Sequence, residues 1–418
     1  MTVTIDRRPW EARLPFFYGW VIVGVTFMVG LMNSGLTWVA IGVFAPPMAE
    51  DTGWSRAALF SGLVLRSYVG AALAPVIGPH FDSPHGARWL SVASGVLMAV
   101  NVCTLAFVQA EWQFVLLFGG VGGVVSAGQA GQLGALVPKW FVQRRGTAMA
   151  VATTGIGLAA LLVAPPLAFL ISVFGWRGAW VCVGVATFVL AALPALLIRR
   201  QPEDVGLLPD NGVNYGAKTR PVERSYTVSE TFRTPQAWLL LAGISLVSLY
   251  TAGLPTNIPS MLEDMGQTRD TAVLGLTVYG AGSVLGRYLW AWPANRFHVR
   301  WVMIAITAYG AVMCPLILAL PSQLALVYPL LAGLGIGGSA SVTQLVWPAY
   351  FGRAHLGAIT GAARLPITLL GGASWVVLAV SMDVFGDYGP GLWLMSGLSA
   401  VGAVLFWVAR PRGSAEPG

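Results

Sequence analysis

The sequence predicts an all-α polytopic membrane protein with twelve transmembrane helices in two bundles of six. Of its 418 residues, 56% are hydrophobic and only 10% are charged, whereas a soluble domain carries roughly 25% charged residues. Apolar runs of about 18–27 residues recur from end to end, each long enough to cross a hydrocarbon core of ~30 Å. A polar, charged segment near the middle of the chain separates six of these runs from the other six.

We expect a first bundle within 1–198, a central cytoplasmic loop over 199–235 and a second bundle within 236–418. The first apolar run starts near Phe16 and is too long for a cleaved signal peptide, so we expect it to be retained. In chain order, the expected spans are 16–44, 54–79, 89–109, 112–138, 146–173, 176–198, 236–262, 271–294, 300–320, 323–350, 356–382 and 389–409.

The sequence gives no reason to expect a cofactor or a metal. Cys103, Cys182 and Cys314 fall singly inside apolar runs, without the spacing of a ligand set or a disulfide framework. No Walker motif is present, so ATP is not the expected fuel. In a soluble protein the net charge of +7 would suggest a nucleic-acid partner. Here the placement of the positive charge relative to the lipid bilayer explains it better, and no nucleic-acid partner is expected.

The positive charges also predict the orientation of the spans. Most of the 24 lysines and arginines fall in the termini and in the loops on the same side of the membrane. Only Arg56, Arg177 and Arg269 fall in the loops on the other side, which collect acidic residues instead. Cytoplasmic loops carry the excess of positive residues. We therefore expect a multi-pass protein of the cell inner membrane with both termini in the cytoplasm.

An internal repeat supports the two-bundle plan. The loop after the second span reads GPHFDSPHGAR from Gly78 to Arg88, and the loop after the eighth reads AWPANRFHVR from Ala291 to Arg300. The run RRGTAMA opens the fifth span, and the run FGRAHLGAITG opens the eleventh. Paired motifs at equivalent places in the two halves indicate that spans 1–6 and 7–12 are duplicates.

Two six-span halves with these paired loops resemble the major facilitator superfamily over essentially the whole chain. The family motif is approximately G-x-x-x-D-[RK]-x-G-x-[RK]; the first copy here has one inserted residue, and Ser83 replaces the basic residue. In that family the loop contributes to gating between conformations, and a tight turn with solvated charges is the alternative. The residues to which the resemblance gives a gating role are Asp82, Gly86, Arg88, Asn295, Arg296 and Arg300.

The charges inside the membrane carry the functional information. Arg66 lies in the second span, Arg287 in the eighth and Arg364 in the eleventh, whereas no acidic residue lies well inside a span. An arginine near the bilayer centre costs at least ~2.5–3.5 kcal/mol. A water-filled cavity and an anionic ligand would offset this cost, and the guanidinium fork matches a carboxylate in bidentate fashion. The pattern therefore predicts an anionic substrate and favours a carboxylate.

Helix geometry places these arginines at depth. At 1.5 Å per residue, Arg287 and Arg364 lie ~12–14 Å from the cytoplasmic ends of their helices and Arg66 ~18 Å. A site near the midplane between two halves is where alternating access places its substrate. The alternatives are that Arg287 bridges helices through backbone carbonyls and water, that Arg364 serves close packing, and that Arg66 snorkels or pairs with acids in the outside loops.

A second resemblance concerns the substrate. Gly19-Trp20, the run EDTGWSRAAL over 50–59 and the run GWRGAW over 175–180 look like the bacterial monocarboxylate-porter and oxalate–formate-antiporter branch. In that branch a span-8 arginine precedes the acid or asparagine of the second loop motif by eight residues, as Arg287 precedes Asn295. The resemblance implies that Arg287 binds the substrate carboxylate.

The chain departs from that branch at three places. Ser283 stands where many proton-coupled members carry an aspartate, and the first span lacks their lysine. Arg364 comes about one turn earlier than the span-11 cation of the oxalate carriers.

Further substrate-binding candidates are polar residues of the spans that line the pathway in this superfamily, together with two that share a helix face with Arg287. Hydrogen bonding between helices is the alternative role for each. These candidates are Asn33, Gln129, Gln132, Asn257, Tyr279, Ser283 and Gln344.

The sequence thus predicts a secondary active transporter of small organic anions, mono- or dicarboxylates, that works by alternating access and is not an enzyme. Its expected partners are a small-molecule carboxylate and the bilayer, and we expect a monomer. A broader efflux carrier for amphipathic or aromatic anions is the alternative. Because proton relays in membranes use Asp, Glu or His and none lies mid-span, anion exchange or facilitated passage is favoured. Proton symport stays open if the substrate itself titrates.

Overall fold

The computed structural model describes residues 10–212 and 225–410, and these are helical apart from turns and short connections. In the first half the elements are η1 (Trp10–Arg13), α1 (Gly19–Ser34), η2 (Gly35–Val39), α2 (Ala40–Thr52), α3 (Arg56–Ile77), η3 (Gly78–Asp82), α4 (Gly86–Thr104), η4 (Leu105–Phe107), α5 (Glu111–Phe114), η5 (Val115–Val121), α6 (Gly122–Ala135), α7 (Val137–Trp140), α8 (Arg145–Thr187), η6 (Phe188–Ala192) and α9 (Leu193–Ala195). After it come η7 (Pro202–Val205), η8 (Pro209–Gly212), α10 (Val228–Phe232), α11 (Pro235–Asp264), α12 (Arg269–Arg296), α13 (Val299–Ala319), η9 (Ser322–Leu324), α14 (Val327–Phe351), α15 (Leu356–Phe385) and α16 (Gly389–Val408).

These elements form the twelve crossings that the sequence predicts. Nine helical stretches in the described residues are long and apolar enough to cross a membrane, and one of them, 145–195, holds two crossings. The stretch 111–135, built from α5, η5 and α6, and the helix α12 complete the set. The fold is therefore the predicted all-α bundle of twelve helices. Residues 213–224 of the predicted central loop lie outside the described residues.

The chain reverses direction at Gly175, inside the segment labelled α8. Gly175 has φ +65°, a left-handed conformation that glycine adopts without the steric penalty of a side chain. The fifth crossing therefore ends there and the sixth begins.

The first crossing is longer than predicted. The helix does not end near residue 44 but continues through Pro46 and Pro47 to Thr52. Gly53, with φ +73°, then caps it by donating to the carbonyl of Ala49.

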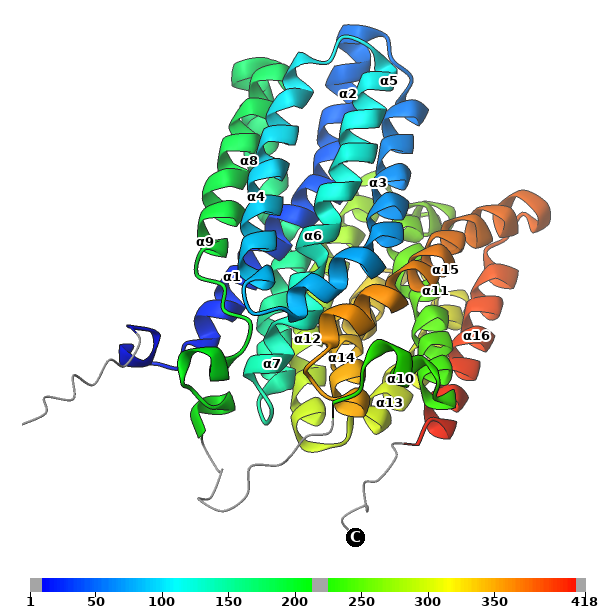
Figure 1. The fold of residues 1–418 in the computed structure, drawn as a ribbon. Helices are drawn as coiled ribbons and strands as arrows, with labels where there is room; N and C mark the ends of the chain where they lie inside the picture. The colour runs from blue at the N-terminus through cyan, green and yellow to red at the C-terminus, as the bar shows by residue number, and fades with distance from the viewer. Residues whose placement is uncertain (1–9, 213–224, 411–418) are drawn as a thin grey trace, which may run out of the picture.

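Both described chain ends lie at the same end of the bundle. The first described element, η1 (dark blue), and the C-terminal end of α16 (red) lie in the lower half of Figure 1 with α7 and α10, and we call this the terminal end. Helices α8 and α12 pair across the two halves of the chain, as do α3 and α15. At the opposite end the helices of the two halves diverge, with α15 leaning away from α3 (Figure 1).

Glycines let α3 and α15 touch through their backbones near the terminal end. A Cβ atom on Gly78 would lie 2.2 Å from the carbonyl oxygen of Gly357, and one on Gly361 would lie 2.3 Å from that of Ala74. Such distances leave no room for a side chain, since the facing atoms belong to the backbone and cannot turn away. The contact between the halves here depends on the glycines.

We therefore expect Gly361→Ala to force α3 and α15 apart and to destabilise the protein by ~1–3 kcal/mol, the usual cost of overpacking. Thermal unfolding of the purified protein in detergent measures this. The matched control is Gly397→Ala in α16, where an added Cβ meets nothing within 4 Å. Equal unfolding temperatures for the two variants would contradict the close contact.

Candidate functional site

A cavity of about 510 Å³ lies between the two halves. Its walls come from α1, α3, α6 and α8 of the first half and from α11, α14 and α15 of the second. Among the described residues that line it, the charged ones are Arg66 and Arg364, and none is acidic. The cavity is therefore electropositive.

Arg66 is held between two irregular segments of the helices around it. Its Nε donates to Thr37 Oγ1 at 3.2 Å, and its guanidinium carbon lies 5.3 Å from the ring centre of Phe118. Thr37 lies in η2 and Phe118 in η5, and both segments are π-helical. A single π-helical turn shifts the side chains that follow it and is frequent at functional sites. Only 2% of Arg66 is exposed, so one edge of a well-packed cation meets the cavity.

Arg364 is the more accessible cation of the cavity. It lies on α15 one turn beyond Gly361, where α15 contacts α3, and its side chain is exposed. Within the part of the chain that the structure describes, no hydrogen bond or ion pair holds its guanidinium. All its donors can therefore reach an anion in the cavity.

Arg287 lies outside this cavity. It is 3% exposed and is covered where α12 packs against α8. One of its terminal nitrogens donates to the backbone oxygen of Ser283 at 2.6 Å and to Ser283 Oγ at 2.7 Å. No acidic residue in the described chain forms an ion pair with it.

The other predicted substrate-binding residues divide in the same way. Asn33, Gln129 and Gln344 line the cavity, as does Thr37, the partner of Arg66. Gln344 reaches across the halves, because a Cβ on Gly134 would lie 2.9 Å from its Oε1. Asn257, Tyr279 and Ser283 are not among the lining residues. Gln132 belongs to α6, but its side chain lies outside the part of the chain that the structure describes.

Asp82 and Asn295, from the two loop motifs, each bind the N-terminus of a helix in the other half. Asp82 accepts from the backbone N–H groups of Gly357 and Ala358, at 3.0 and 2.9 Å, where α15 begins. Asn295 Oδ1 accepts from the N–H of Gly146 at 2.8 Å, where α8 begins. The two motifs thus make equivalent contacts across the halves.

The remaining predicted gating residues stay within their own half. Gly86 is the first residue of α4, where a Cβ would lie 2.1 Å from the carbonyl oxygen of His80. Arg88 and Arg296 pack over the rings of Trp89 and Trp292. Arg300 donates to backbone carbonyls at the end of α16.

A buried ion pair accompanies Asp82. Lys139 Nζ lies 2.7 Å from Asp82 Oδ1, and the two side chains are 1% and 9% exposed. Burial lowers the pKa of Lys139 although the negative charge of Asp82 opposes this shift. The pair therefore holds a cation that would be poorly accommodated without its carboxylate.

The segment that follows the first half adds a further link at the terminal end. Glu203 of η7 forms an ion pair with Arg353, just before α15, and Arg353 also donates to the backbone oxygen of Lys139. Sequence reasoning missed these ion pairs, since the partners lie in separate loops with no spacing to relate them.

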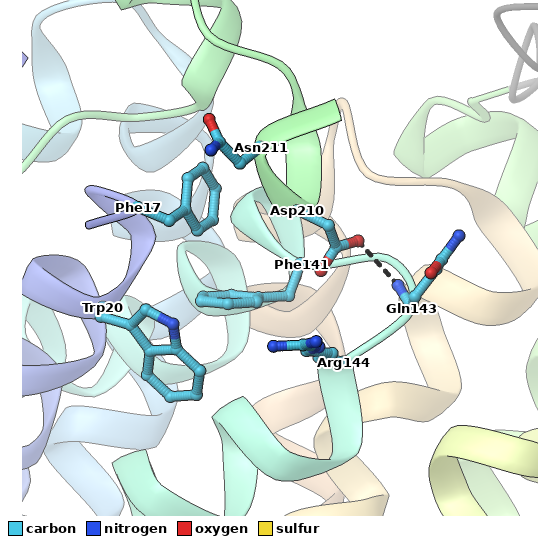
Figure 2. Close-up of a pocket in the computed structure, with 7 residues that line it drawn as sticks. All are labelled: Phe17, Trp20, Phe141, Gln143, Arg144, Asp210 and Asn211. Atoms are coloured by element: carbon cyan, nitrogen blue, oxygen red, sulfur yellow. Dashed lines mark hydrogen bonds between the residues drawn. The ribbon is translucent and has the colours of Figure 1, made fainter. Parts of the chain in front are cut away.

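A second cavity, of about 250 Å³, lies at the terminal end between the first half and η8 (Figure 2). Phe17, Trp20, Phe141 and Arg144 line it, together with Asp210. The carboxylate of Asp210 accepts from the N–H groups of Val142 and Gln143, both at 2.8 Å. These bonds tie η8 to the loop before α8.

Comparison with known proteins assigns the family. Residues 26–364 match the Major Facilitator Superfamily. The chain belongs to this superfamily. A solved member, the proton:xylose symporter XylE bound to 6-bromo-6-deoxy-D-glucose, superposes with a TM-score of 0.69 at 15% identity, over 93% of this chain and 95% of that one. This likeness concerns the fold alone.

Its relatives in the superfamily include the branch that the sequence resembles. The chain is 27% identical to monocarboxylate transporter 11 of Mus musculus, over 94% of this chain and 88% of that protein. It is 25% identical to the gallate transporter of Pseudomonas putida, over 97% and 94%. It is 22% identical to the oxalate:formate antiporter of Oxalobacter formigenes, over 88% and 85%. The predicted resemblance to this superfamily and to its monocarboxylate and oxalate–formate branch is confirmed. The chain is a transmembrane transporter of this superfamily.

The ion pair at Asp82 gives a stability prediction. Asp82→Ala leaves the Lys139 cation buried without a partner, and removing one member of a buried pair costs ~3–5 kcal/mol. Asn295→Ala removes only neutral hydrogen bonds, worth ~0.5–1.5 kcal/mol each. We therefore expect the unfolding temperature of Asp82→Ala in detergent to be well below that of Asn295→Ala.

The double variant Asp82→Ala, Lys139→Met serves as the control. It removes the cation together with its partner, so it should regain part of the stability that Asp82→Ala loses. A double variant less stable than Asp82→Ala would show that the unpaired charge is not the cause.

Proposed function

We propose that this protein is a secondary transporter of small organic anions, of the mono- or dicarboxylate class, that works by alternating access. The observation that carries this proposal is the lining of the central cavity, in which the described charged residues are Arg66 and Arg364. A carboxylate would offset both the charge and the lost hydration of these groups, because the guanidinium fork binds carboxylates with paired hydrogen bonds.

The relatives support the same substrate class. Three of them are named for monocarboxylates, for gallate and for oxalate and formate, and all of these are carboxylates. The volume of about 510 Å³ is that of an ordinary small-molecule site, since such pockets span ~300–1,000 Å³. It leaves room for an aromatic acid as well as for a short aliphatic one.

The inter-half contacts support a conformation in which the cavity opens away from the terminal end. The hydrogen bonds of Asp82 and Asn295 and the glycine contacts of α3 with α15 all lie at the terminal end. Because positive residues gather there, we propose that this end is cytoplasmic, that the protein lies in the cell inner membrane and that the conformation faces outward.

In this proposal Asp82 and Asn295 act as gating residues. Each holds the first turn of a helix from the other half, and opening the terminal end must break both sets of bonds. A carboxylate at a helix N-terminus gains from the helix dipole, so the Asp82 contact contributes more to closure than the Asn295 contact.

The main test is transport by an Arg364→Gln variant in proteoliposomes. We expect its kcat/KM for gallate, oxalate, formate or lactate to fall about 30-fold or more, because losing one partner of a desolvated charge pair costs ~2–5 kcal/mol. Arg364→Lys should lie between it and the natural protein, since an ammonium keeps the charge but not the fork.

The matched control is Arg177→Gln, which removes an exposed arginine packed over Trp176 outside the cavity. It should transport the same substrates at nearly the natural rate. If Arg364→Gln retained the natural kcat/KM for every carboxylate tested, the anion proposal would fail. Uptake of organic cations by the natural protein would point to a different substrate class.

The mode of transport is tested by preloading the vesicles. Without an acidic or histidine side chain at mid-span, we expect internal carboxylate to accelerate uptake of external labelled carboxylate, as in exchange. An uptake rate that does not depend on internal substrate but increases with an imposed pH gradient would show proton coupling instead. Such a result would leave the anion proposal standing and overturn the exchange mode.

A further inference from the structure

The buried cation Arg287 has a structural setting that the cavity does not explain. Its guanidinium is held by Ser283 of its own helix through one terminal nitrogen. Its Nε is buried and has no hydrogen-bond partner. An arginine with an unused donor inside a protein is costly, and the described chain supplies no acid to offset it. This conformation therefore covers a cation whose binding capacity is not filled.

The cover is Gly157 of α8, in the opposite half. A Cβ atom on Gly157 would lie 2.7 Å from one terminal nitrogen of Arg287, 3.0 Å from the central carbon and 3.2 Å from the other nitrogen. All three atoms belong to the guanidinium, so this group lies flat against the glycine. Any side chain at position 157 would displace it.

The neighbouring Gly155 provides a contrast. A Cβ there would lie 2.2 Å from the backbone oxygen of Phe27, so Gly155 serves the packing of α8 on α1 within the first half. At Gly157 the nearest atoms belong to a side chain instead. The lack of a side chain at Gly157 matters for Arg287 rather than for the approach of two backbones.

Between Arg287 and the terminal end, further hydrogen bonds join α8 to α12. Thr154 Oγ1 bonds the hydroxyl of Tyr288 at 3.3 Å, and Asn295 bonds Gly146 at 2.8 Å. Opening the terminal end must separate these pairs. The same movement would lift Gly157 off the guanidinium.

We propose that Gly157 is a positioning residue for Arg287: it seats the guanidinium while the terminal end is closed and releases it when that end opens. This inference rests on the proposed function as an anion carrier. An organic anion in the present cavity meets Arg364, and one in the cavity open to the terminal end would meet Arg287 with its free donors. The two conformations thus offer different arginines to a carboxylate.

The first experiment is a double-mutant cycle that needs no transport. In a protein with Cys103, Cys182 and Cys314 changed to Ser, the reporter is Thr154→Cys at the α8–α12 contact. Gly157→Ala should raise its reaction rate with a small thiol reagent about fivefold or more, because the added methyl group clashes with the guanidinium and disfavours the closed contact.

The same Gly157→Ala substitution is then made together with Arg287→Gln. Because Gln is too short to lie on position 157, the rate should now stay within about twofold of the Arg287→Gln value, the behaviour of coupled sites. An equal rise with and without Arg287 would overturn the proposal, since Gly157 would then serve backbone packing. No rise in either background would overturn it as well.

The second experiment tests from which side position 287 is reached. A single cysteine, Arg287→Cys, is treated with an impermeant thiol reagent in membrane vesicles of each orientation. It should react from the terminal side only, whereas Thr368→Cys, in the lining of the present cavity, should react from the opposite side. Reaction of position 287 from the opposite side, or from neither, would overturn the proposal. Since labelling uses no substrate, a failure of the anion proposal would not alter either readout.

Discussion

The cost of holding guanidinium groups away from bulk water is the constraint on which the site depends. An arginine at mid-membrane depth costs at least ~2.5–3.5 kcal/mol, and this chain carries three such residues with no paired acid among the described residues. Each is accommodated differently. Arg66 is wrapped by π-helical segments, Arg364 opens onto the cavity, and Arg287 lies on a glycine. In this conformation an anion in the cavity can therefore reach Arg66 in part and Arg364 fully, but it cannot reach Arg287.

The two halves are held together at the terminal end by two contacts of the same kind, and these contacts differ in strength. A helix N-terminus presents unpaired N–H groups and a positive dipole end, and a side-chain oxygen from the other half satisfies them. Asp82 brings a full negative charge and therefore needs Lys139 beside it. Asn295 brings a neutral amide and needs no counter-ion. The duplicated fold is thus asymmetric in charge where it is symmetric in hydrogen bonding.

Periodicity and composition could predict the crossings, because each must bury its backbone polar groups in a helix of membrane length. The turn at Gly175 was predictable from the same pattern, whereas the run through Pro46 and Pro47 to Thr52 was not. Depth along a helix was predictable for the arginines, but rotation about its axis was not. For that reason the sequence could place Arg287 and Arg364 at similar depths without revealing that one is covered and the other exposed.

Rotation also explains why the glycines were harder to interpret than the charges. A glycine has no side chain whose chemistry would reveal what it faces, so Gly155 and Gly157 look alike in sequence. In the fold, one meets the backbone of α1 and the other the guanidinium of Arg287. A carrier that alternates between two packings needs surfaces that fit in one state and part in the other. A glycine against a flat cation provides such a surface, because the contact leaves no interlocked side chain to disengage when the helices separate.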